Sequence, residues 1–150
     1  HSQGNISEAA KLYQYFVSQG LNDHRVFSNY ANILKDHGKS KQAEFLYKQA
    51  IKLKPDFSIA HLNLGTLLKE LGRLQEAKLS IYKAIELKPD CAEAYSTLGI
   101  IIKDLGNLLD AEKLLRKAIK FKPNLDAIRI KYRLCLVYFS YIRGFGVLGY

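Results

Sequence analysis

A repeat of 34 residues runs through this chain and constrains its fold more than any other feature. Small or conformationally special residues recur at that interval in four columns, which are Gly38, Gly72 and Gly106; Ala43, Ala77 and Ala111; Ala50, Ala84 and Ala118; and Pro55, Pro89 and Pro123. These three prolines are the only ones in the sequence. A fixed period of this length is typical of solenoids, in which each repeat buries its apolar face against its neighbours.

Each column has a physical role in a pair of helices. Apolar residues precede the glycine at helical spacing, and glycine tolerates the left-handed conformation that ends a helix. The two alanine columns stand two turns apart on the following helix, so both let a neighbouring helix come close. Proline cannot continue a helix and therefore separates one pair from the next. The pattern predicts three helical hairpins, built from helices at residues 24–37, 40–53, 58–71, 74–87, 92–105 and 108–121.

The flanks carry parts of the same repeat. One period earlier, Gly4 falls in the glycine column and Ala9 in the first alanine column, which predicts that residues 5–19 are the second helix of a truncated repeat. One period later, residues 126–142 continue the columns of a first helix, and residues 143–150 form a tail. We therefore expect an all-α chain that is a single array over residues 1–150, with full repeats at 24–57, 58–91 and 92–125. Because the sequence contains no methionine, we expect it to be a fragment or a processed product.

Two other interpretations of residues 126–150 stay open. Residues 128–134 alternate between apolar and basic side chains, as a strand does, and basic residues around an apolar run would also suit a membrane surface. We favour a helix, since the columns continue in register. The stretch from Leu134 to Ile142 is almost wholly apolar and offers no polar cap to the array. We expect it either to be buried by something outside this sequence or to be mobile, and we predict self-association through it.

The columns resemble those of the tetratricopeptide repeat family. The segments His61-Leu62-Asn63-Leu64-Gly65 and Tyr95-Ser96-Thr97-Leu98-Gly99, together with the glycine, alanine and proline columns that follow them, match the spacing of that family. The first repeat departs from the pattern, with Tyr30 and Ala31 in place of leucine and glycine. The resemblance implies a right-handed superhelix of antiparallel helix pairs, whose first helices line a concave groove that binds peptides or protein surfaces.

One branch of that family clamps the C-terminal carboxylate of chaperone tails with lysine, asparagine and arginine side chains. The corresponding positions in this sequence are Ser28, Asn32, Asn63, Glu93 and Thr97. Only the two asparagines match, and without the cations a carboxylate loses its charge-assisted partners. We therefore do not expect a chaperone-tail clamp.

The array is more similar to the repeat arm of O-linked N-acetylglucosamine transferases. In that arm, asparagines repeated along the inner face hold the backbone of an extended polypeptide. Asn29 and Asn63 occupy this column here, and Thr97 replaces the third asparagine. An amide side chain both donates and accepts hydrogen bonds, so it can satisfy a peptide backbone of any sequence. The alternative is that both asparagines follow the family consensus as solvated polar residues.

Charge and composition limit the classes of binding partner but do not identify one. The formal net charge of +9 favours acidic peptides and leaves nucleic acid open. With only Cys91 and Cys135, and with histidines at no ligand spacing, we expect no metal and no cofactor. No apolar run approaches the roughly 20 residues that span a bilayer, and the N-terminal residues lack the layout of a signal peptide. We expect a cytoplasmic protein.

No nucleophile, phosphate-binding loop or catalytic carboxylate pair stands out, so we expect no enzymatic activity. We expect a protein-interaction scaffold that binds an extended peptide or a partner surface in the concave groove. The predicted contacts lie on the first helices: Arg25, Ser28, Asn29, Asn32, Asn63, Thr66 and Thr97. One alternative is the substrate-recruiting arm of a larger enzyme, such as a glycosyltransferase. RNA binding is a further alternative, although the positions that would read bases hold no regular code.

Overall fold

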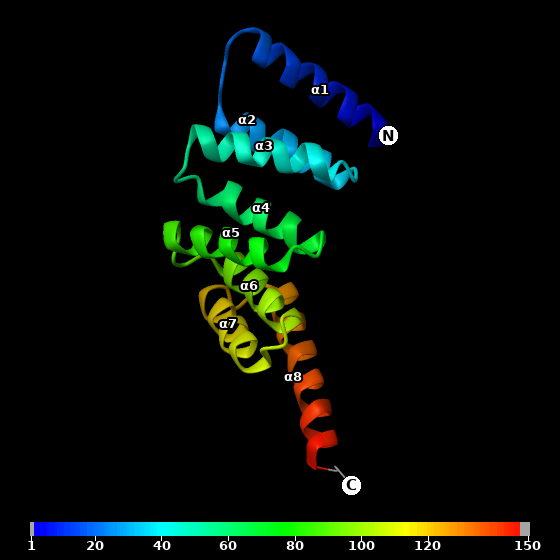
Figure 1. Cartoon of the computed structure of the whole chain (residues 1–150), viewed down its shortest axis with the longest axis vertical. Coiled ribbons are helices and arrows are strands. Elements are labelled where there is room, and N and C mark those ends of the chain that lie inside the picture. Colours follow the sequence, from blue (N-terminus) through cyan, green and yellow to red (C-terminus); the bar gives the residue numbers. More distant parts are fainter. Residues whose placement is uncertain (1, 148–150) are drawn as a thin grey trace.

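The computed structural model describes residues 2–147, and it places the side chains of residues 4–144. Every regular element in this range is an α-helix, as predicted. The helices are α1 (Ser2–Ser18), α2 (His24–Asp36), α3 (Ser40–Leu53), α4 (Ser58–Glu70), α5 (Leu74–Leu87), α6 (Ala92–Asp104), α7 (Leu108–Phe121) and α8 (Asp126–Val147). Figure 1 shows them stacked into an elongated array with the two termini at opposite ends.

The central six helices form the three predicted hairpins, in which α2 pairs with α3, α4 with α5 and α6 with α7. Each first helix ends where a glycine takes the left-handed conformation, with φ of 75° at Gly38, 76° at Gly72 and 92° at Gly106. The next residue then donates its N–H back into the helix, as in the bond of 2.9 Å from Arg73 to the carbonyl of Leu68. This bond satisfies a carbonyl at the helix end and turns the chain toward the second helix.

The helices of a hairpin approach closely because two columns hold small residues. The alanines of both columns are buried in all three repeats. The glycines facing them have no room for a side chain, since a Cβ on Gly65 would lie 2.6 Å from Ile81, and one on Gly99 would lie 2.9 Å from Leu115. The core of the array is therefore built from these close contacts together with leucine, isoleucine and tyrosine side chains.

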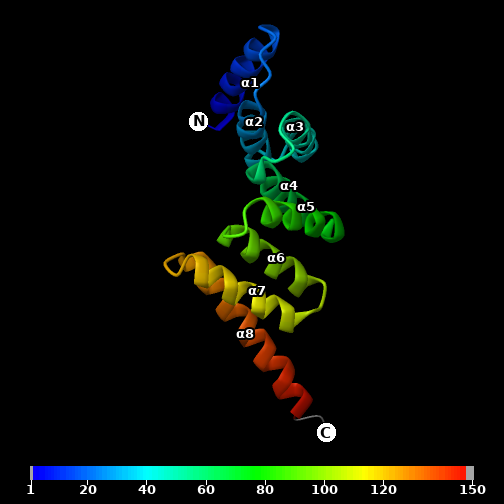
Figure 2. The same ribbon diagram turned by 90° about the vertical axis from the view of Figure 1, so that its left-hand side faces the viewer.

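The hairpins stack with a curvature that gives the array an inner and an outer side. Successive first helices contact one another, α2 with α4, α4 with α6 and α6 with α8. Among the described residues, the second helices α3, α5 and α7 make no such contacts with each other. The first helices therefore form the inner, shorter side of the curve, and Figure 2 shows the succession of hairpins from the side.

Both ends of the array differ from the sequence-based prediction in their boundaries. Gly4 lies inside α1 and does not precede it. At its other end, α1 ends at Ser18 and is followed by a turn at Gly20, whose φ is 68°, whereas α3, α5 and α7 are followed by turns that contain the prolines. Residues 128–134 are helical, which excludes the strand interpretation, and α8 continues past Ile142, where we expected a tail, to Val147. Residues 148–150 of that predicted tail lie outside the described residues.

Candidate functional site

The inner surface is formed by the sides of α2, α4, α6 and α8 that face away from the second helices. Two columns run along it from repeat to repeat at the 34-residue period. One contains Asn29, Asn63, Thr97 and Lys131, and the other contains Asn32, Thr66, Ile100 and Leu134. Polar residues thus dominate the N-terminal half of the surface, and apolar residues enter it toward α8.

The structure joins two of the predicted contact residues directly. The side-chain amide of Asn63, on α4, donates a hydrogen bond of 3.1 Å to Oδ1 of Asn32, on α2. The same oxygen accepts a hydrogen bond from the hydroxyl of Tyr47, which reaches it from α3. Three helices therefore hold this pair of asparagines in one orientation.

Tyr47 is a residue that the sequence analysis did not single out. Its side chain is fully buried, and burial raises the pKa of its hydroxyl, which therefore stays protonated and donates to Asn32. A signal was present in the sequence, because Ile81 and Leu115 occupy the same column of the next two repeats. A hydroxyl in an otherwise apolar column indicates a polar partner nearby, but it does not say which one.

The other predicted contacts are less available. Ser28 and Thr97 keep only 2% and 8% of their surface exposed, so the structure does not place them where a partner could touch them. Neighbouring helices cover them, which a single-helix pattern does not reveal. Thr66 donates its hydroxyl to the carbonyl of Leu62 in its own helix, at 2.9 Å. Asn29 is exposed, and no hydrogen bond of its side chain occurs within the described residues.

Arg25 is exposed, but its guanidinium is paired with Asp23, the residue that caps its helix. The carboxylate of Asp23 accepts a hydrogen bond from the backbone N–H of Arg25 at 2.8 Å and another from its guanidinium at 2.6 Å. These hydrogen bonds lower the pKa of Asp23 from its ordinary value of 3.8 to about 2. The charge of Arg25 is therefore balanced by Asp23 within the first turn of α2. A partner would have to compete with Asp23 to bind Arg25.

A small hollow of about 240 Å³ lies between the beginnings of α4 and α6. Ile59 and Leu62 give it an apolar wall, and Glu93 and Lys122 form an ion pair at its edge. Hydrogen bonding to Lys122 lowers the pKa of the Glu93 carboxyl, which is therefore ionised at neutral pH. A carboxylate at this place would repel an acidic chain end, and its partner Lys122 is already engaged.

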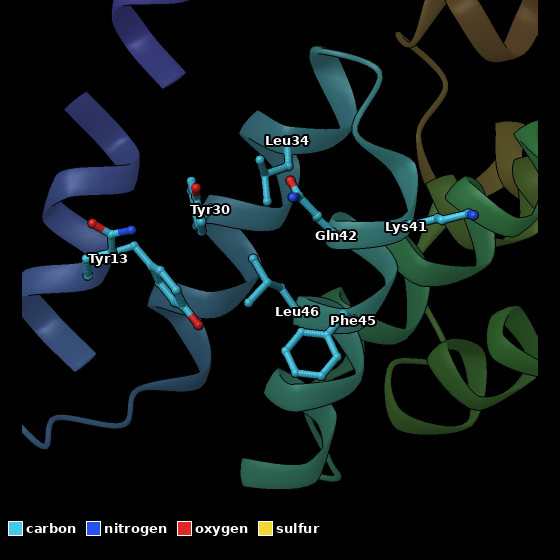
Figure 3. A pocket seen from close by; sticks show the side chains of 8 residues that line it. Tyr13, Tyr30, Leu34, Lys41, Gln42, Phe45 and Leu46 are labelled. Atoms are coloured by element: carbon cyan, nitrogen blue, oxygen red, sulfur yellow. The ribbon is translucent and has the colours of Figure 1, made fainter. Parts of the chain in front are cut away.

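A second hollow, of about 380 Å³, lies among α1, α2 and α3 (Figure 3). Its walls are mainly aromatic and aliphatic: Tyr13, Tyr30, Leu34, Phe45 and Leu46. None of the predicted contact residues lines it, and the polar lining groups Gln14, Lys41 and Gln42 do not form a catalytic arrangement. This hollow arises where α1 packs against the first hairpin.

Over the described residues, no group of histidine, cysteine, aspartate and glutamate side chains is arranged to hold a metal ion. No described helix is both long enough and apolar enough to cross a membrane. The acidic residues that recur at the ends of the first helices are paired with the preceding lysine in two cases, Lys35 with Asp36 at 4.0 Å and Lys103 with Asp104 at 3.5 Å. Such exposed pairs are typical of a solvated surface.

Solved structures with the same arrangement of helices are numerous. MamA aligns with 95% of this chain and 81% of its own, at a TM-score of 0.81 and 21% identity. YrrB, described as a TPR protein with an unusual peptide-binding site, aligns over 87% of this chain and 68% of its own, at 0.76 and 21%. The first TPR of Spaghetti (RPAP3), bound to the HSP90 peptide SRMEEVD, aligns over 79% and 94%, at 0.74 and 19%. At these identities the likeness shows the fold alone, and it singles out no branch of relatives.

A search of curated protein sequences gave no match. Family models described as tetratricopeptide repeat match residues 24–57, 46–78 and 92–125, which cover the first and third hairpins in full and the second hairpin as far as the first turns of α5. The matched segments contain the glycine column, the first alanine column and the close contacts of Gly65 and Gly99, and of the other two columns only Ala84 and Pro89 lie outside them. The chain therefore belongs to the tetratricopeptide repeat family.

Proposed function

We propose that this array is a protein-binding scaffold that holds an extended segment of a partner along its inner surface, with Asn29, Asn32 and Asn63 contacting the partner's backbone. The observation that carries the proposal is the hydrogen bond between Asn63 and Asn32, anchored by Tyr47. It orients two amide groups in advance, which reduces the entropy that binding would otherwise cost.

The amides keep unused hydrogen-bonding capacity. No hydrogen bond within the described residues uses Oδ1 of Asn63, the amide nitrogen of Asn32 or the side chain of Asn29. Together these atoms supply both donors and acceptors, as the backbone of an extended peptide requires. The proposed recognition is therefore broad in sequence preference. It would serve equally in a substrate-recruiting arm of a larger enzyme.

A chaperone-tail clamp fits the surface poorly, although such a peptide is bound in the structure of the first TPR of Spaghetti. In this chain, Ser28 and Thr97 are buried at two of the positions where that clamp requires polar or cationic contacts. Glu93 places a negative charge at a third. We expect the peptide SRMEEVD not to compete with the partner segment.

The test uses peptides selected for binding to this chain from a random library. We expect the double variant Asn29→Ala/Asn63→Ala to bind them about five- to 150-fold more weakly, since each of two lost hydrogen bonds contributes about 0.5–1.5 kcal/mol. Isothermal titration calorimetry measures the affinity. The matched control is Asn22→Ala/Asn124→Ala, which removes two exposed asparagines that lie outside the first helices.

Recognition of the peptide backbone can be tested a second way with the same peptides. Methylation of the peptide's backbone nitrogens removes its N–H donors and should abolish binding, whereas scrambling its side-chain order should change the affinity little. Equal binding of the chain and the Asn29→Ala/Asn63→Ala variant, both equally stable to heat, would show that the partner binds elsewhere.

A further inference from the structure

The inner surface ends in a stripe of exposed apolar side chains on α8. Six large residues of this helix remain well exposed: Ile130 (56%), Leu134 (64%), Val137 (67%), Tyr138 (53%), Tyr141 (62%) and Ile142 (45%). Their spacing along the chain, every three or four residues, places them on one side of the helix. This apolar stripe spans 13 residues, or about 18 Å at the rise of an α-helix.

The apolar stripe does not lie on the side of α8 where a second helix would pack. In α2 that side carries Phe27, Ala31 and Leu34, which are all buried in the core that α2 shares with α3. The same columns of α8 hold Arg129, Arg133 and Leu136, and both arginines are exposed. The column of Arg133 is the one in which Gly65 and Gly99 leave no room even for a Cβ. Arg133 is far larger than the alanine and glycines of its column in the three hairpins, so a second helix could not approach α8 there as closely as α3, α5 and α7 approach their partners.

The apolar stripe instead continues the inner surface. Leu134 follows Asn32, Thr66 and Ile100 in their column, and Tyr138 follows Asp104 in another. The apolar stripe also lies beside the end of α6 in the structure. Tyr138 and Ile142 line a hollow of about 480 Å³ together with Lys103 and Asp104 of α6. In Figures 1 and 2, α8 runs on beyond the end of α7, so much of its length has no neighbouring helix beside it.

The charged side chains of α8 on both sides of the apolar stripe are of one sign, and the carboxylate that lines the hollow beside it, Asp104 of α6, is paired with Lys103 at 3.5 Å. Arg129 and Arg133 lie along one edge, and Lys131, which is half-buried, lies along the other. Arg143 adds a fourth cation, and the one acidic residue of α8 is Asp126, in its first turn. A second copy of the chain, packed stripe to stripe, would bring these cations together and is opposed by like-charge repulsion. An acidic partner meets no such opposition.

We propose that the apolar stripe of α8 binds an acidic amphipathic helix of a partner protein, with the partner's apolar side against Ile130, Leu134 and Tyr138 and its carboxylates beside Arg129, Arg133 and Lys131. Two helices pack along such a seam when apolar residues recur every three to four positions on each, as they do on α8. The basic edges select the charge of the partner and orient it. This inference extends the proposed function to a second part of the inner surface, and the two can fail separately.

The experiment compares two synthetic helical peptides of about three to four turns, which match the length of the apolar stripe. Both carry leucines at helical spacing on one side, and the other positions hold glutamate in the first peptide and lysine in the second. We expect the glutamate peptide to bind the chain, with an affinity that falls as salt is added, and the lysine peptide not to bind. The double variant Leu134→Gln/Val137→Gln should weaken binding at least about tenfold.

The matched control is Leu79→Gln/Leu109→Gln, which changes two equally exposed leucines on the second helices α5 and α7 and should leave binding unchanged. Circular dichroism verifies that each variant keeps its helices. Equal binding of both peptides would overturn the role of the basic edges. A dimer by light scattering that Leu134→Gln/Val137→Gln converts to monomer would assign the stripe to a second copy and overturn the proposal.

The asparagine variant separates the two proposals. If Asn29→Ala/Asn63→Ala abolishes binding of the glutamate peptide and Leu134→Gln/Val137→Gln does not, the apolar stripe is not the site, while the proposed function of the asparagines stands. If the asparagine variant binds this peptide normally and loses the selected extended peptides, both proposals are supported.

Discussion

At the scale of single residues, hydrogen bonds within the chain decide which polar side chains a partner can use. Arg25 and Asn63 are both polar residues of the first helices, yet their situations differ. The guanidinium of Arg25 is held by Asp23 through hydrogen bonds of 2.6–3.2 Å. Asn63 uses one amide hydrogen toward Asn32 and keeps its carbonyl oxygen unused. Availability for binding therefore follows from the local partners and not from polarity alone.

The pair of Asp23 and Arg25 makes stability depend on pH in a defined window. The pKa of Asp23 in the folded chain, about 2, is lower than its ordinary value of 3.8. The ionised Asp23 therefore stabilises the folded chain fully when the pH is above 3.8, and this stabilisation is lost as the pH falls through about 2. We expect Asp23→Asn to be less stable than the natural chain at neutral pH and equally stable at the acid end of the window. Asparagine keeps the helix cap, so the comparison isolates the charge.

Urea denaturation at a series of pH values measures this difference. Other carboxyl groups with lowered pKa values, such as Glu44 and Glu76, titrate in both proteins and cancel in the comparison. A stability difference that stays constant down to the lowest pH would show that the ion pair of Asp23 does not contribute.

At the scale of helices, α1 is held to the array mainly by aromatic contacts. The ring of Tyr13 stacks on Tyr30 at 4.7 Å between centroids and meets Phe27 edge-on at 5.6 Å. Phe16 stands in the column where α3, α5 and α7 have an alanine, so α1 cannot approach its neighbour as closely as they do. Residues 19–23 then link α1 to α2 without the proline turn of the other repeats.

We expect Tyr13→Ala to release α1 while the rest of the array stays folded. The loss of these ring contacts should lower the free energy of local opening of α1 by about 1–2 kcal/mol. Hydrogen exchange followed helix by helix measures the change. Tyr15→Ala is the matched control, because Tyr15 lies on the same helix and is 65% exposed. Faster exchange across all helices in Tyr13→Ala, or equal effects of both variants, would contradict the prediction.

At the scale of the whole molecule, contacts join only helices that are near neighbours in the array. Within the described residues, α4 contacts α2, α3, α5 and α6, and no helix contacts one more than two positions away along the chain. Such an array behaves as a one-dimensional chain of units, in which each repeat is stabilised by its two neighbours. The central repeat has both neighbours, whereas the units at the ends have one.

We expect hydrogen exchange to be slowest in α4, α5 and α6 and to become faster toward α1 and α8. Four of the most completely buried large side chains, Leu67, Ile81, Leu98 and Ile101, lie in those three helices, whereas α3, α7 and α8 have one each, Tyr47, Leu115 and Ile128. Mass spectrometry of peptides from each helix gives the rates. Uniform protection from α1 to α8 would mean that the array unfolds as one cooperative unit, which would contradict the prediction.

The sequence alone was enough to determine the helices and hairpins of the centre, because the features that set them act over a few residues. Gly38, Gly72 and Gly106 end helices through their own backbone conformation, and the prolines end them by lacking an N–H. The repetition of these signals at one interval also determined that successive hairpins are equivalent and stack in order.

The tertiary structure decided which side chains the inner surface offers. Thr97 shares its column with the exposed Asn29, and Ser28 shares its column with the exposed Ile130, yet both Ser28 and Thr97 are buried. Tyr47, Asn32 and Asn63 come from three different helices and meet only once these have packed. The apolar residues of α8 were visible in the sequence, but their exposure was not, because it depends on which helices pack beside α8. Local backbone chemistry is a property of each segment, whereas exposure and pairing depend on what the rest of the chain brings alongside it.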